Sequence, residues 1–150
     1  MKTDTRIIVI DDPRYAEEKE LRENHSEALA IKAYVEKHHS NNFAILTPYK
    51  KQRDLLYKTL SNRRQYIYTI HSSQGREWDT VILSVVDTQK MFFTDSKNKF
   101  SKGVKIINTA ISRAKKELVI ICDKNFWQAH NNDQFIGNLV SNCSTLELAR

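Results

Sequence analysis

Glycine is scarce in this 150-residue chain, and the positions of the few glycines exclude one common kind of nucleotide site. The three glycines are Gly75, Gly103 and Gly137. None lies in the frame G-x-x-x-x-G-K-[ST], whose backbone amides and lysine hold the phosphates of a bound nucleotide. The acidic pair Asp11-Asp12 follows a predicted strand, but no phosphate-binding loop precedes it. We therefore expect that this chain cannot complete nucleotide hydrolysis alone.

Cysteine and long apolar runs are also scarce. The two cysteines, Cys122 and Cys143, lie in apolar surroundings without the spacing of metal ligands. We expect reduced thiols in a cytoplasmic protein and no metal site. No apolar run approaches the ~20 residues that span a bilayer, and no signal-peptide core follows Met1. Neither export nor a membrane partner is expected.

Charge is distributed unevenly along the chain. The formal net charge is +6, which suggests nucleic acid as a partner without establishing it. Residues 11–27 hold seven acids against three bases, whereas residues 97–116 hold seven bases and no acid. On charge alone, a solvated face and a polyanion site explain the basic run equally well.

Short β-branched or apolar runs alternate with helical patterns, which favours an α/β fold. The predicted strands are Arg6–Ile10, Phe43–Leu46, Tyr66–Ile70, Thr80–Val86 and Leu118–Cys122. Predicted helices begin near Asn24, which stands in capping-box spacing with Glu27, at Thr47-Pro48, near Gly103 and near Phe135. Single helices between strands imply crossover connections, and so a three-layer α/β domain with a mostly parallel central sheet. We expect one domain over residues 1–150, with a core at about 6–123 and a peripheral helical segment at 124–150.

Three polar segments contain more functional groups than a hydrophobic core requires. They are residues 47–52, 69–79 and 108–114. We expect all three at the carboxyl ends of the strands, where parallel sheets bind ligands. In the middle segment, Gly75 permits positive φ or close approach to a ligand. From composition alone, a solvated connection explains that loop equally well.

Helical phase predicts where Arg113 points. Val104, Ile107, Ile111 and Ala114 share an apolar stripe, so Arg113 is expected on the opposite, exposed face. A surface arginine usually serves solubility, but its planar guanidinium also matches phosphate oxygens.

In this order and spacing, the three segments resemble motifs IV, V and VI of the superfamily 1 helicases. They are most similar to the branch that includes the nonsense-mediated-decay RNA helicases and related DNA replication helicases. The strings that carry the resemblance are Thr47-Pro48-Tyr49-x-x-Gln52, Gln74-Gly75-Arg76-Glu77-x-Asp79 followed by Val81-Ile82-Leu83-Ser84, Asn108-x-Ala110-x-Ser112-Arg113-Ala114, and Asn24-x-x-Glu27-Ala28 upstream. The resemblance covers roughly residues 6–123 and implies the second of two RecA-like motor domains.

The resemblance also implies ligands and residue roles. ATP with Mg²⁺ would be bound mainly by an N-terminal RecA-like domain that carries the P-loop, and the substrate would be single-stranded DNA or RNA. Arg113 would be the arginine finger that reaches the γ-phosphate across the domain cleft. The other nucleotide contacts would be Gln74, Gly75 and Glu77. The nucleic-acid backbone would be contacted by Thr47, Tyr49, Thr69, His71 and Ser72, although plain helix capping explains Thr47 equally well.

Two rival functions are weighed against this interpretation. The first is a degenerate motor domain that only grips nucleic acid or a partner protein. The combination of Gln74, Glu77 and Arg113 argues against it, because a pure binding module does not need these residues together. The second is a nuclease or another phosphoryl-transfer enzyme, which is disfavoured because no clustered Asp/Glu/His set offers a two-metal site.

Overall fold

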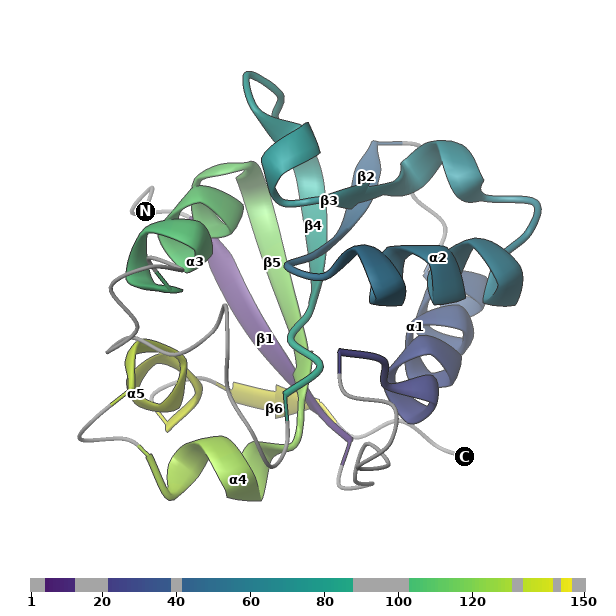
Figure 1. The fold of residues 1–150 in the computed structure, drawn as a ribbon. Coiled ribbons are helices and arrows are strands. Elements are labelled where there is room, and N and C mark those ends of the chain that lie inside the picture. Colours follow the sequence, from purple (N-terminus) through teal and green to yellow (C-terminus); the bar gives the residue numbers. More distant parts are fainter. Residues whose placement is uncertain are drawn as a thin grey trace.

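The computed structural model describes residues 5–12, 22–38, 42–87, 103–130, 134–141 and 144–146. Within these ranges, six strands form one sheet in the order β3-β2-β4-β5-β1-β6, and every pair of neighbours is parallel (Figure 1). The strands are β1 (Arg6–Asp11), β2 (Phe43–Thr47), β3 (Ile67–Thr69), β4 (Trp78–Ser84), β5 (Ala114–Cys122) and β6 (Ser144–Leu146). All five predicted strands are confirmed with shifted ends, and β6 is additional to them.

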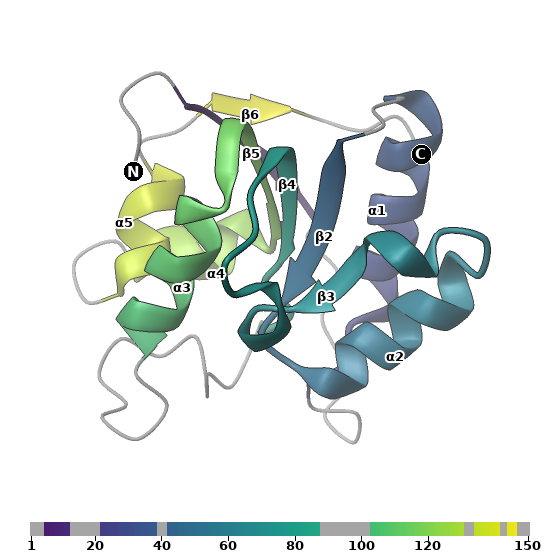
Figure 2. The ribbon, with the colours of Figure 1, turned by 90° about the horizontal axis from the view of Figure 1, so that it is seen from above.

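Helices cover both faces of the sheet. They are α1 (His25–Lys37), α2 (Lys50–Thr59), α3 (Gly103–Ser112), α4 (Lys124–Gln128) and α5 (Phe135–Ser141), with short 3-10 turns η2 (Arg64–Tyr66) and η3 (His71–Ser73). Figure 2 shows α1 and α2 on one side of the sheet and α3, α4 and α5 on the other. The expected three-layer α/β architecture is therefore confirmed. None of the described helices is long and apolar enough to cross a membrane.

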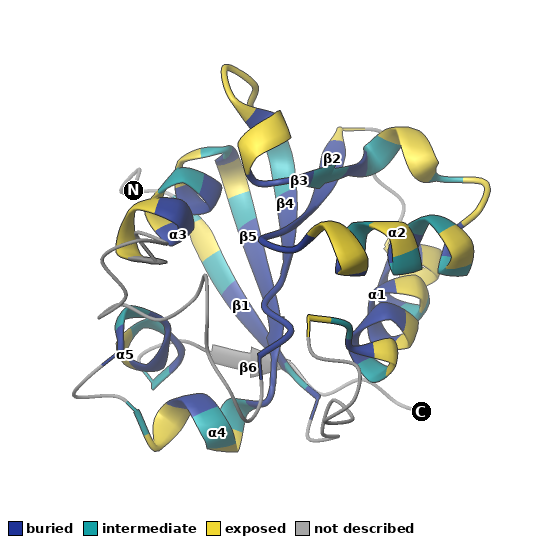
Figure 3. Ribbon diagram, in the orientation of Figure 1, coloured by how far each residue is buried: buried dark blue, intermediate teal, exposed yellow. Residues whose placement is uncertain are grey.

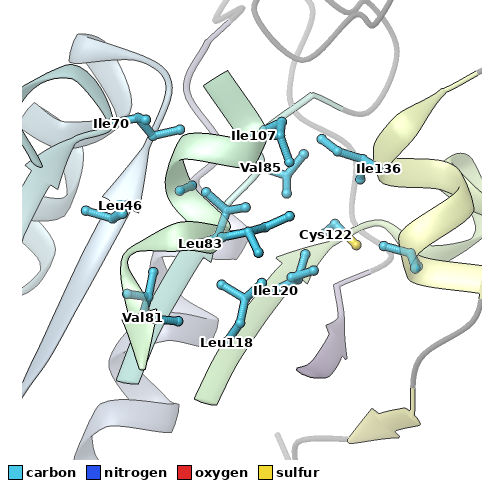
Figure 4. Close-up of a cluster of buried hydrophobic side chains, with 14 of the residues drawn as sticks. Leu46, Ile70, Val81, Leu83, Val85, Ile107, Leu118, Ile120, Cys122 and Ile136 are labelled. Carbon is cyan, nitrogen blue, oxygen red and sulfur yellow. The ribbon is translucent and has the colours of Figure 1, made fainter. Parts of the chain in front are cut away.

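The central strands are buried on both faces, which explains their continuous apolar sequences. Every residue of β2 is buried, as are the last four residues of β4 and the last five of β5 (Figure 3). Side chains from β4 and β5 pack beside Ile107 of α3 and Ile136 of α5 (Figure 4). A second cluster fills the space between the sheet and the two helices α1 and α2.

The chain beyond residue 123 also contributes to the core. Trp127 is 0% exposed, and Ile136 and Val140 are buried with it in the cluster on the α3 face. Strand β6 extends the sheet beside β1. The expected core range of 6–123 does not include these residues.

Two local predictions are wrong. Helix α2 begins at Lys50 with Tyr49 as its N-cap, not at Thr47-Pro48, because Thr47 still belongs to β2 and pairs with Thr69. In α3, Val104 is exposed, and the buried stripe is Ile106, Ile107, Ala110 and Ile111. Ala114 is buried as a residue of β5, because the helix has already ended at Ser112.

Candidate nucleotide and nucleic-acid site

Loop 70–77 connects the carboxyl end of β3 to the amino end of β4. Its first half is held by Thr69, whose Oγ1 accepts the Ser72 backbone N–H at 3.3 Å, while the Ser72 hydroxyl donates to the Thr69 carbonyl at 2.9 Å. Thr69 is buried, whereas His71 and Ser72 are exposed. These bonds fix a short 3-10 turn that presents His71 and Ser72 to solvent.

The second half of the loop is more open. Gly75 has φ +76°, and no atom lies within 4 Å of a Cβ built on it, so the backbone conformation alone favours glycine here. Gln74, Gly75 and Glu77 are all exposed. Buried Ser73 anchors the loop from beneath through a hydroxyl bond to the Ile70 carbonyl. The predicted nucleotide contacts therefore lie on an exposed loop with a buried base.

Arg113 lies beside this loop, although it is far away in sequence. It follows α3 and precedes β5, and its carbonyl accepts the Trp78 backbone N–H at 2.9 Å. Its side chain is half-buried, not fully exposed as predicted, because the turn from α3 to β5 is tied to the start of β4. The Arg113 Nε is buried and has no hydrogen-bond partner in the part of the chain that the structure describes.

The expectation that all three polar segments lie at the carboxyl ends of the strands is correct only for residues 47–52 and for the start of segment 69–79. Thr47 and Thr69 end β2 and β3 and pair in register. Arg113 lies at the opposite edge, because a helix that precedes a strand ends where that strand begins. Loop 70–77 starts where the Ile70 N–H bonds the Thr47 carbonyl at 3.0 Å, and it ends beside Arg113. The loop thus joins the two edges of the sheet.

Thr47 and Tyr49 lie beneath the surface. They are 0% and 1% exposed, and the Tyr49 hydroxyl donates to Asp87 Oδ2 at 2.5 Å. At this point the chain exposes the amino end of α2 instead, where no side chain caps the helix and where Lys50 and Lys51 are exposed.

A buried polar network, not predicted as such from the sequence, lies behind these segments. Asn24 Oδ1 accepts the Glu27 N–H at 3.0 Å, which is the first half of the predicted capping box. The second half is not formed, because the Asn24 N–H donates to Gln52 Oε1 at 2.7 Å. Glu27 Oε1 instead accepts the Ser84 hydroxyl at 2.8 Å and the Val86 N–H at 2.9 Å.

This network holds a strained turn at the end of β4. Val86 has φ 75°, which is unusual for a β-branched residue, and the Asp87 N–H bonds the Val85 carbonyl at 2.9 Å in a γ-turn. Asn24 Nδ2 donates to the Val86 carbonyl at 3.2 Å, so both sides of the turn are held from α1. Burial raises the pKa of Glu27 well above its usual value. One sequence signal could have found the network, since Glu27 lies on the same helical face as Ala28, Ile31 and Val35.

Comparison with known proteins agrees with this architecture. A family model described as an AAA domain matches residues 3–125. The chain is 33% identical over 104 residues to the DNA-binding protein SMUBP-2 of Mesocricetus auratus, covering 68% of this chain and 10% of that protein. It is 28% identical over 107 residues to the DNA polymerase alpha-associated DNA helicase A of Saccharomyces cerevisiae, covering 65% of this chain and 15% of that protein.

One solved structure shares the fold over nearly the whole chain. It is the C-terminal domain of a possible DNA helicase from Lactobacillus plantarum WCFS1, with a TM-score of 0.52 at 12% identity, covering 96% of this chain and 84% of the other. The chain thus belongs to the AAA domain family, as a RecA-like domain related to the superfamily 1 helicases of the branch named above. It spans about a tenth of the length of the SMUBP-2 proteins that it matches.

Proposed function

We propose that residues 1–150 form the second motor domain of a cytoplasmic, ATP-dependent superfamily 1 DNA or RNA helicase. The domain supplies an arginine finger and part of the groove for a single strand, and it is inactive without an N-terminal RecA-like domain. ATP with Mg²⁺ is bound mainly by that first domain, because this chain has no P-loop. When bound, Mg²⁺ would neutralise charge that develops on the phosphates, whereas the residues of this chain would position the nucleotide and stabilise the transition state.

The observation that carries the proposal is the contact between loop 70–77 and the turn at Arg113. The Trp78 N–H bond to the Arg113 carbonyl brings Glu77 and Arg113 to one end of β4 and β5. A guanidinium near the transferring phosphoryl group stabilises the charge of the transition state.

Loop 70–77 also supports coupling between nucleotide and nucleic acid. Its first half exposes His71 and Ser72 near the carboxyl ends of β2 and β3, and its second half exposes Gln74, Gly75 and Glu77 toward the Arg113 turn. In this proposal His71 and Ser72 contact the backbone of the single strand directly. Thr47 and Tyr49 act from beneath, by placing the uncapped amino end of α2, whose amides attract phosphate.

The proposal is tested by binding of fluorescently labelled single strands to the 150-residue chain. Phosphate contacts predict an affinity that falls steeply as salt rises. His71→Ala should weaken binding about two- to tenfold, the range of one hydrogen bond. His38→Ala is the matched control, because His38 is an exposed histidine at the end of α1 and is assigned no strand contact. Binding that ignores salt, or equal losses in the two variants, would contradict the placement of the groove.

A further inference from the structure

We propose that Tyr68, Arg76 and Trp78 form a stacking site for one nucleobase of the bound single strand. The inference rests on the proposed function and adds to it a mode of recognition that phosphate contacts do not provide. It assigns three residues that the predicted groove of Thr47, Tyr49, Thr69, His71 and Ser72 leaves out.

The Arg76 and Trp78 side chains both contact the Tyr68 ring. The Arg76 guanidinium carbon lies 5.2 Å from the centre of the Tyr68 ring, and Arg76 Nη1 donates to the Tyr68 hydroxyl at 2.7 Å. The Tyr68 and Trp78 ring centres are 5.2 Å apart, with 38° between the ring planes. The result, called the row below, is a group of three flat side chains, a guanidinium, a phenol and an indole, in which Tyr68 contacts the other two.

The row is built into the fold on one side and open on the other. Tyr68 lies on the edge strand β3 and Trp78 begins β4, and both pack against the buried cluster on the α3 face. Both residues nevertheless remain only partly buried, and Arg76 is exposed. The two aromatic residues therefore reach the surface next to a cation.

The position of the row points to nucleic acid. Tyr68 directly precedes Thr69 and the exposed turn of His71 and Ser72, while Arg76 and Trp78 lie on either side of Glu77. A strand whose phosphates lie on His71 and Ser72 would carry its bases past these rings. Stacking on aromatic rings and arginine is how single strands are held without sequence preference.

Nearby charge favours the same partner. Exposed cations at this end of the sheet include Arg76 and Lys116. Of the acids there, Asp79 lies 3.7 Å from Lys116 Nζ. A partner that is both flat and anionic satisfies the rings and the cations together, and a nucleotide of a single strand has both properties.

The chain offers a matched control of the same chemistry elsewhere. Arg53 and Arg64 lie over the ring of Tyr57 at 5.7 and 5.8 Å. Tyr57 lies on α2 and packs against the other buried cluster, behind the opposite face of the sheet. If both cation–aromatic pairs only stabilise the surface, replacing Tyr57 and replacing Tyr68 should change single-strand binding equally. If Tyr68 belongs to a stacking site, only the change at Tyr68 should weaken binding of the bases.

The test compares two oligonucleotides of equal length, one of thymidines and one of abasic nucleotides with the same phosphates. We expect the 150-residue chain to bind the thymidine strand about 5- to 150-fold more tightly, the range of one base–aromatic stack. Tyr68→Leu and Trp78→Leu keep an apolar side chain without a ring, and each should reduce this preference. Tyr57→Leu should leave it unchanged.

Tryptophan fluorescence gives a second readout. The chain has two tryptophans, and Trp127 is fully buried, so a stacked base should quench the emission of Trp78 alone. The thymidine strand should quench emission, the abasic strand should not, and W78F should remove the effect.

Each other outcome has a definite meaning. Equal, salt-dependent binding of both strands without quenching would overturn the stacking site and leave the proposed groove intact. Binding of neither strand at low salt would instead overturn the proposed function, and the stacking site with it. Quenching by free ATP but not by the thymidine strand would overturn the assignment to the single strand. If Tyr57→Leu reduced the preference for the thymidine strand as much as Tyr68→Leu does, the assignment of a specific stacking site would be overturned.

Discussion

Gln52→Ala tests the buried network that joins α1, α2 and the end of β4. The Gln52 side chain is 0% exposed, and it makes three hydrogen bonds. Its Oε1 accepts the Asn24 N–H at 2.7 Å, and its Nε2 donates to the Asn24 carbonyl at 3.1 Å and to the Ser84 hydroxyl at 3.2 Å. Truncation removes all three at once.

The magnitude follows from which groups lose their last partner. The Asn24 N–H would be left buried without an acceptor, which costs about 1–3 kcal/mol. The Asn24 carbonyl keeps the Ala28 N–H, and the Ser84 hydroxyl keeps Glu27, so these two losses amount to about 0.5–1.5 kcal/mol each. We therefore expect Gln52→Ala to lower the free energy of unfolding by about 2–6 kcal/mol.

Urea unfolding followed by circular dichroism measures this loss. Lys51→Ala, at the exposed neighbouring position of α2, should stay within about 0.5 kcal/mol of the wild type. Gln52→Glu keeps an acceptor for the Asn24 N–H but turns a second acceptor toward the Asn24 carbonyl, so it should also destabilise the chain. If Gln52→Ala were as mild as Lys51→Ala, the reasoning about the network would be refuted.

Three further predictions concern pH, glycine and hydrolysis. The pKa of Glu27 is raised above its ordinary value of 4.5, so its contribution to stability is full below that pH and is lost as pH rises through the folded pKa. The stability of Glu27→Gln relative to the wild type should therefore increase from pH 5 to pH 8 in urea unfolding, and a constant difference would contradict the assignment. Gly137→Ala should unfold at a lower urea concentration than Gly75→Ala, because a Cβ at Gly137 collides with the Trp127 and His130 carbonyls. At Gly75 a Cβ meets no atom, and only the positive φ destabilises alanine, by about 1–2 kcal/mol. The 150-residue chain alone should release no phosphate from ATP, with or without single strands, and turnover near ~1 s⁻¹ would show that the active site has been misplaced.

The fold was predictable because its signals are periodic and local. Continuous apolar runs such as Phe43–Leu46 occur where both faces of a strand are covered, and the alternation of strands with helices implies parallel order. The sequence pattern could not predict β6, a three-residue strand whose position depends on pairing with β1. The start of α2 was misplaced because Thr47 favours a helix cap locally, while its pairing with Thr69 keeps it in the sheet.

The sequence predicts a set of candidate site residues but not their arrangement. The motif spacing identified loop 70–77 and Arg113, yet it gave no reason to expect the bond between Trp78 and Arg113 or the half-buried guanidinium. Asn24 and Glu27 looked like a reciprocal cap, because a local pattern contains no information about Gln52 or Ser84. Those partners come from other elements, and only the packing of α1 against α2 and β4 brings them together.

The most direct test of the central claim is ATP hydrolysis by a protein that contains both this chain and a P-loop domain, with Arg113→Ala. Lys115→Ala, an exposed cation two residues further on, is the control. We expect hydrolysis in the Arg113 variant to fall by ~10³ or more, because the cation acts chiefly in the transition state. ATP binding should weaken only modestly, and single-strand affinity without nucleotide should stay near that of the wild type and of Lys115→Ala. If Arg113→Ala left hydrolysis intact and abolished strand binding, Arg113 would belong to the nucleic-acid surface and the arginine-finger assignment would be wrong.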